Sequence, residues 1–201
     1  MRKLFLLLSL LPAASHTVRA EPLTQGERDR ALSELYASRK RFLDAIAGLS
    51  DAQWKFKADP AKWSIAECAE HITVSEDFIF GVVAKLMKSP ADPSKREQTK
   101  GKDEVVLRSV VDRSRKFQAP EPIVPANRWP DRQALVDHFI ESRDHTLDYV
   151  RSTPDDLREH FGPHPAMGML DAYQWILLLS AHTQRHTAQI DEVKANASYP
   201  R

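Results

Sequence analysis

Four stretches of the chain repeat apolar residues every three or four positions, with charged residues between them. This spacing places the apolar side chains on one face of an α-helix, so each stretch predicts a long amphipathic helix. The predicted helices span residues 24–48, 64–88, 131–152 and 170–194. Because each helix must cover its apolar face, the four together predict an all-α fold, a four-helix bundle.

The connections are predicted from residues that start or interrupt helices. Ser64, followed three positions later by a glutamate, forms a capping-box signature, so the second helix is expected to begin there. The polar, proline-punctuated residues 89–103 predict an exposed connection. Within the same long connection, residues 104–117 can form one additional short helix, whereas residues 119–130 contain four prolines and cannot. Residues 153–169 predict a turn-rich bridge without a convincing strand.

Residues 1–20 have the pattern of a cleaved secretory signal peptide. Two cations precede an apolar run, residues 4–14, and the small residues Val18 and Ala20 stand before the expected cut. The run is shorter than the roughly 20 residues that a membrane-spanning helix needs, so no stable membrane anchor is expected after cleavage. The pattern therefore predicts a secreted or periplasmic protein whose residues 21–201 form one domain.

Composition narrows the classes of function. The signal segment carries three cations and no acid, so the remaining chain has a formal net charge of −2 in place of +1, which argues against nucleic acid binding. The single cysteine, Cys68, excludes an internal disulfide framework. With 42% hydrophobic residues and six glycines, the composition suits a helical protein better than a β-rich one.

Three histidines are candidate metal ligands. His182 and His186 are four residues apart on the apolar face of the last helix, so both can reach one ion. Such a pair alone more often marks a polar end of the core. A third histidine favours a metal site instead, because His71 lies near the core face of the second helix. Three imidazoles in a bundle interior are costly without a partner, and a divalent ion removes that cost. Three protein ligands also leave positions open for water or substrate, which is the catalytic pattern.

Two segments resemble a known family, the DinB-like superfamily of metal-binding four-helix bundles, which includes bacillithiol-transferase-like enzymes. These segments are WSIAECAEHI and HPAMGMLDAYQWILLLSAHTQRHTAQI, residues 63–72 and 164–190. The resemblance implies that His71, His182 and His186 hold one divalent metal, zinc or nickel. It also implies thiol-dependent transfer, but reduced thiols are scarce outside the cytoplasm, so the apparent signal peptide favours a metal-dependent hydrolase.

Further residues are candidates for the pocket, each with a plainer alternative. Glu76 lies one to two turns beyond the histidine of the second helix. Its carboxylate either accepts a hydrogen bond from the N–H of a ligand histidine or is solvated at the surface. Gln189 shares a face with the histidine pair, and it either lines the pocket or is an exposed amide. His164 either borders the mouth of the pocket or caps a turn. Glu70 points about 100° away from its neighbouring histidine and is a poor candidate. Cys68 could offer a thiolate, but a small buried hydrophobe is the favoured interpretation.

The sequence thus predicts an exported protein that binds one divalent metal and acts as a hydrolase or transferase on an unknown small molecule. A non-catalytic metal-binding or structural bundle is the first alternative, and a partner-binding helical module without metal is the second. No catalytic residue can be named, because the chain has no HExxH, GxSxG or P-loop motif. Relatives are often dimeric, so the resemblance makes a homodimer plausible, although no exposed apolar stripe in the sequence can be assigned to its interface.

Overall fold

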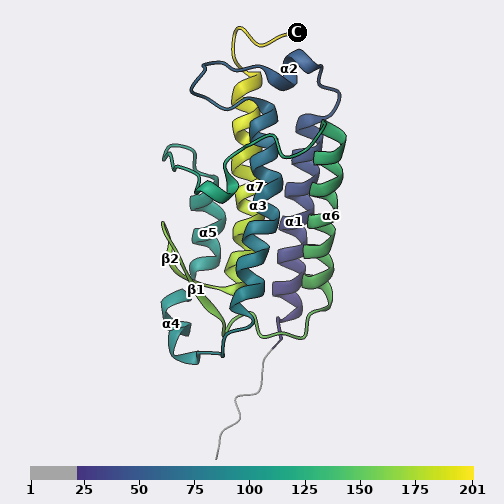
Figure 1. The fold of residues 1–201 in the computed structure, drawn as a ribbon. Helices are drawn as coiled ribbons and strands as arrows, with labels where there is room; N and C mark the ends of the chain where they lie inside the picture. Colours follow the sequence, from purple (N-terminus) through teal and green to yellow (C-terminus); the bar gives the residue numbers. More distant parts are fainter. Residues whose placement is uncertain (1–21) are drawn as a thin grey trace, which may run out of the picture.

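Four long helices form the body of the molecule in the computed structural model, which describes residues 22–201. They run side by side along the length of the molecule (Figure 1). Their bounds are α1 Gln25–Ile46, α3 Ile65–Leu86, α6 Arg132–Ser152 and α7 Ala172–Lys194. The predicted four-helix bundle is therefore confirmed, whereas the predicted signal peptide lies outside the described residues. Among those residues no helix is both long and apolar enough to cross a membrane.

Side-chain caps fix where the long helices begin. Ser64 accepts a hydrogen bond from the backbone N–H of Glu67, whose carboxylate accepts one from the backbone N–H of Ser64, as the predicted capping box requires. Thr24 and Asp171 cap α1 and α7 with similar reciprocal bonds, and Asp131 caps α6. These bonds satisfy N–H groups that have no partner within the helix. The start of α3 is therefore set locally by its first turn.

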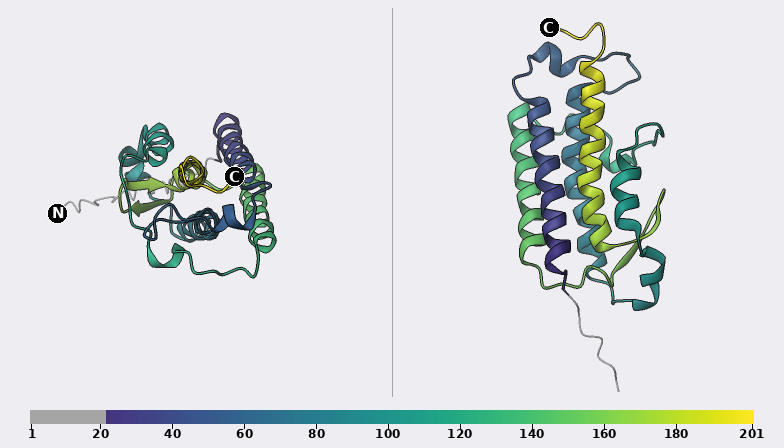
Figure 2. Two further views of the ribbon diagram at one scale, coloured as in Figure 1. Left: turned by 90° about the horizontal axis from the view of Figure 1, so that it is seen from above. Right: turned by 180° about the vertical axis from the view of Figure 1, so that it is seen from behind.

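Helix α7 lies at the centre of the molecule, in contact with α1, α3 and α5, Lys102–Val111. The first half of α7 is buried on all sides, since Ile176, Leu177, Leu178 and Leu179 are each at most 3% exposed. A helix that is apolar all round needs neighbours all round. The short helix α5 covers the side of α7 that the other long helices leave open (Figure 2).

The remaining elements are short and lie in the connections. The bridge before α7 contains an antiparallel hairpin, in which Phe161 pairs with Asp171 and His164 pairs with Gly168. The sequence pattern did not predict this hairpin, because four-residue strands that contain proline and glycine show no alternating pattern. Gly168 supplies the positive φ of 69° that the turn requires. The bounds of the short elements are α2 Asp51–Lys55, η1 Pro93–Lys95, α4 Arg96–Thr99, η2 Glu121–Ile123, β1 Phe161–His164 and β2 Gly168–Asp171.

One arginine links the four long helices from inside the bundle. Arg143 of α6 is fully buried and forms a two-bond ion pair with Glu76 of α3, at 2.5 and 2.8 Å. Its other N–H groups donate to the carbonyl of Leu35 and the hydroxyl of Ser38 on α1, and to the hydroxyl of Thr183 on α7. All five guanidinium donors therefore have acceptors, which is the condition under which a buried charge is tolerated.

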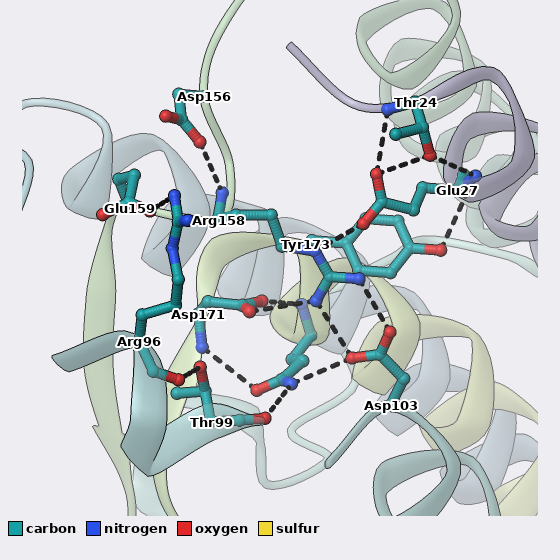
Figure 3. Close-up of polar contacts among 11 residues, drawn as sticks. Thr24, Glu27, Arg96, Thr99, Asp103, Asp156, Arg158, Glu159, Asp171 and Tyr173 are labelled. Carbon is teal, nitrogen blue, oxygen red and sulfur yellow. Dashed lines mark hydrogen bonds and ion pairs between the residues drawn. The ribbon is translucent and has the colours of Figure 1, made fainter. Parts of the chain in front are cut away.

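A second arginine joins three helix starts at one end of the bundle (Figure 3). Arg158, in the bridge after α6, forms ion pairs with Glu27 of α1, Asp103 of α5 and Asp171 at the start of α7, at 2.7 to 3.0 Å. Its guanidinium also lies 4.0 Å from the ring centre of Tyr173. Carboxylates are favourable at helix N-termini, and Arg158 offsets the repulsion among the three.

We expect the substitution Arg158→Met to lower the free energy of unfolding at pH 7 by about 2 kcal/mol, because three carboxylates would lose their shared donor. Denaturant unfolding measures this change. The matched control is Lys40→Met, which removes an exposed ion pair with Asp44 and should change stability by less than about 0.5 kcal/mol. Equal losses in the two variants would contradict a special contribution from the Arg158 cluster.

Candidate metal centre

The structure brings His71 of α3 together with His182 and His186 of α7. The Nε2 atom of His71 lies 3.2 Å from that of His182 and 3.1 Å from that of His186. Within the described residues, these three are the one group of metal-ligating side chains whose donor atoms converge closely enough to share an ion. The packing of α3 against α7 thus places together ligands that are more than a hundred positions apart in the sequence.

All three imidazoles lie in surroundings that favour their neutral form. His71 is 2% exposed, and burial lowers its pKa to about 4, although the hydrogen bond to a backbone carbonyl raises it in part. Burial and the charges of neighbouring histidines hold the pKa values of His182 and His186 well below the usual range. At neutral pH each ring therefore has one nitrogen lone pair to offer.

Hydrogen bonds at the far side of two rings decide which nitrogen faces the centre. The Nδ1 of His71 lies 2.7 Å from the carbonyl oxygen of Ile123, and the Nδ1 of His186 lies 3.0 Å from the amide oxygen of Gln189. Oxygen acceptors require the proton on Nδ1, so the lone pair is on Nε2 in both rings. The Nε2 atoms are the atoms that converge.

This arrangement fits a divalent metal. Two lone pairs that face each other at about 3 Å repel, and a cation between them reverses the sign of that interaction. Nitrogen ligands at 2.0–2.1 Å from a tetrahedral zinc ion would be about 3.3 Å apart, close to the spacing of these Nε2 atoms. Imidazole is a common ligand of both zinc and nickel, the metals that the family resemblance implies.

The three other candidate pocket residues have different partners. The amide oxygen of Gln189 lies 3.0 Å from Nδ1 of His186. Glu76 instead uses its carboxylate for Arg143 and Thr183 in the bundle core. His164 caps a turn by accepting from the backbone N–H of Ala166.

Cys68 and Trp63 lie near the histidines without being part of the ligand group. Cys68 is fully buried, and burial raises the pKa of its thiol to about 12, so the small-hydrophobe interpretation fits its surroundings. The Trp63 ring lies 4.8 Å from His71 and 6.1 Å from His186, between ring centres. The sequence pattern does not indicate this packing of Trp63 against two of the ligands.

Glu70 is a second residue whose partners the sequence pattern does not indicate. It is not part of the ligand group, and it is only 4% exposed. Its carboxylate binds backbone N–H groups of residues 126–128 and the guanidinium of Arg128. A helical projection shows where a carboxylate points but not which distant loop meets it there.

Comparison with known proteins agrees with this fold. Residues 34–190 match the family model described as the DinB superfamily. The chain belongs to the DinB superfamily. A curated relative in this comparison is the uncharacterized protein YuaE of Bacillus subtilis (strain 168), which is 27% identical over 149 residues, covering 74% of this chain and 88% of YuaE.

A solved structure gives the same arrangement of helices. YfiT from Bacillus subtilis matches with a TM-score of 0.57 and 12% identity, over 95% of each chain. YfiT is described as "a probable metal-dependent hydrolase with an unusual four-helix bundle topology". At this identity the match shows a shared fold alone, which places the histidine cluster of the present chain in a four-helix bundle known from experiment.

Proposed function

We propose that this DinB-superfamily protein is exported and holds one divalent metal, zinc or nickel, through His71, His182 and His186. With that metal it acts as a hydrolase or transferase on a small molecule. The observation that carries the proposal is the convergence of three Nε2 atoms whose rings are kept neutral by burial. The description of YfiT as "a probable metal-dependent hydrolase" supports the same class of reaction.

A divalent ion held by three imidazoles acts as a Lewis acid towards a substrate oxygen and acidifies water. The protein contributes charge and shape. The ligand group contains no carboxylate, and Arg185, which is 8% exposed, contributes to the low pKa values of His182 and His186. Because neither the neutral imidazoles nor Arg185 neutralises the positive charge of an ion at this site, substrates with an electron-rich oxygen are favoured.

Access is expected from the side of His182. His71 is 2% and His186 9% exposed, and Trp63 packs against both, whereas His182 is more exposed than either. A hydrolase is favoured over a thiol transferase if the protein is exported, because low-molecular-weight thiols are mostly oxidised outside the cytoplasm.

The first test is metal content of the purified, untagged protein, measured by mass spectrometry. We expect about one transition metal per chain in the parent, and its loss in the folded variants His71→Ala and His182→Ala. The control His138→Ala removes a histidine that pairs with Asp77 on the surface and should retain the metal. A parent that binds no metal after reconstitution with zinc or nickel would rule the proposal out.

Activity separates the enzyme from a purely structural metal site. We expect hydrolysis or thiol conjugation within a panel of esters, amides and electrophiles, with turnover lost on chelation and in a folded His186→Ala protein. If chelation only lowers the melting temperature and no substrate turns over, the non-catalytic bundle is the better description.

A further inference from the structure

The connection between α5 and α6 crosses over the outside of α3 (Figures 1 and 2). Its 3₁₀ helix η2 contacts α3 and ends at Ile123, whose carbonyl oxygen accepts the hydrogen bond from Nδ1 of His71. A carbonyl can only accept, so its position decides which nitrogen of His71 carries the proton. The orientation of a candidate metal ligand therefore depends on a segment without long regular structure.

Glu70 fixes the far part of this segment. Its two oxygens accept hydrogen bonds from the backbone N–H groups of Ala126, Asn127 and Arg128, at 2.8, 2.9 and 3.2 Å. Asn127 has a positive φ of 56°, the left-handed conformation in which successive N–H groups form a concave site for an anion. The buried carboxylate thus holds three consecutive peptide units.

Arg128 carries this constraint back to Ile123. Its Nη1 donates to Glu70 at 2.9 Å and to the carbonyl of Val124 at 2.8 Å, and its Nη2 donates to the carbonyl of Pro122 at 3.1 Å. Pro122 and Val124 flank Ile123. The arginine therefore occupies the two neighbouring carbonyls and leaves that of Ile123 for His71.

We propose that Glu70, acting through Arg128, is a positioning residue for the metal ligand His71. It keeps the Ile123 carbonyl against Nδ1, which holds the Nε2 lone pair towards His182 and His186. The proposal rests on the proposed function in that it takes His71 as a ligand. Simple anchoring of the loop would stabilise the fold as well, but it would not change the proton position on His71 or the affinity for metal.

Two variants and one control separate these roles in the purified protein. Glu70→Gln removes the charge and turns an amide N–H₂ group towards backbone donors, whereas Arg128→Met keeps Glu70 and removes the link to Pro122 and Val124. The control Glu67→Gln changes a carboxylate one turn earlier on α3, which caps Ser64 and pairs with Lys57. Circular dichroism confirms that each variant is folded.

The measurements are zinc affinity, by competition with a chromophoric chelator, and the tautomer of His71 in the metal-free protein, by ¹⁵N NMR. We expect both variants to bind Zn²⁺ about 10–100-fold more weakly, as when groups behind a metal ligand are lost. The His71 ring should change from one Nδ1–H tautomer to a mixture, and the control should match the parent.

Parent-like zinc affinity and tautomer in either folded variant would overturn the proposal, as would equal losses in the Glu67→Gln control. A parent that binds neither zinc nor nickel would be a failure of the proposed function alone. In that case the metal-free tautomer still decides whether Glu70 and Arg128 position His71.

Discussion

Replacing Arg143 by methionine is expected to lower the free energy of unfolding by about 3–5 kcal/mol, because Glu76 would remain as a buried charge without its partner. Both side chains are at most 1% exposed, so water cannot replace the lost donors. Leu35, Ser38 and Thr183 would each lose a hydrogen bond from the guanidinium as well. Equilibrium unfolding in urea measures the change.

The double variant Arg143→Met with Glu76→Met distinguishes loss of a partner from loss of packing. Replacing both members of a buried ion pair by apolar side chains of similar size is often neutral, so the double variant should recover most of the lost stability. A double variant as unstable as the single one would show that the network contributes through its bonds to α1 and α7 instead of through charge neutralisation.

The long helices could be predicted from the sequence because their signals are local. The Ser64 capping box and the apolar spacing place α3 within two residues of its observed end. The histidine pair of α7 follows from a spacing of four, and His71 follows from its place near the core face of α3. Periodicity alone does not bring α3 to α7, but both apolar faces must be covered, and this brings the three rings together.

The unpredicted parts depend on contacts between distant segments. The sequence places Glu76 on the same helix as His71, one to two turns beyond it. Its partner Arg143 is 67 positions away, in a stretch whose pattern predicts a charged helix surface. Glu70 binds a loop 56–58 positions away. The sequence gives the direction of each carboxylate, whereas only the packed structure shows the partner that makes its burial tolerable.

Acid should destabilise the metal-free protein well above the pH at which carboxylates titrate. The unfolded chain has histidines of ordinary pKa, near 6.5, whereas burial lowers the folded pKa of His71 to about 4 and those of His182 and His186 well below 6.5. The unfolded state therefore binds more protons in this window. Stability is fully present above pH 6.5 and is lost as the pH falls towards 4.

From pH 7.5 to 5 we expect a loss of about 2 kcal/mol from His71 alone, with further losses from the other two rings. Urea unfolding in the presence of a chelator, at several pH values in this range, measures the total. The variant with glutamine at all three positions retains the carboxylates and the other histidines, so the difference between its pH dependence and that of the parent isolates the cluster. Parallel pH profiles would mean that the three rings accept protons in the folded state as readily as in the unfolded chain. The neutral, converging lone pairs on which the metal site depends would then not exist.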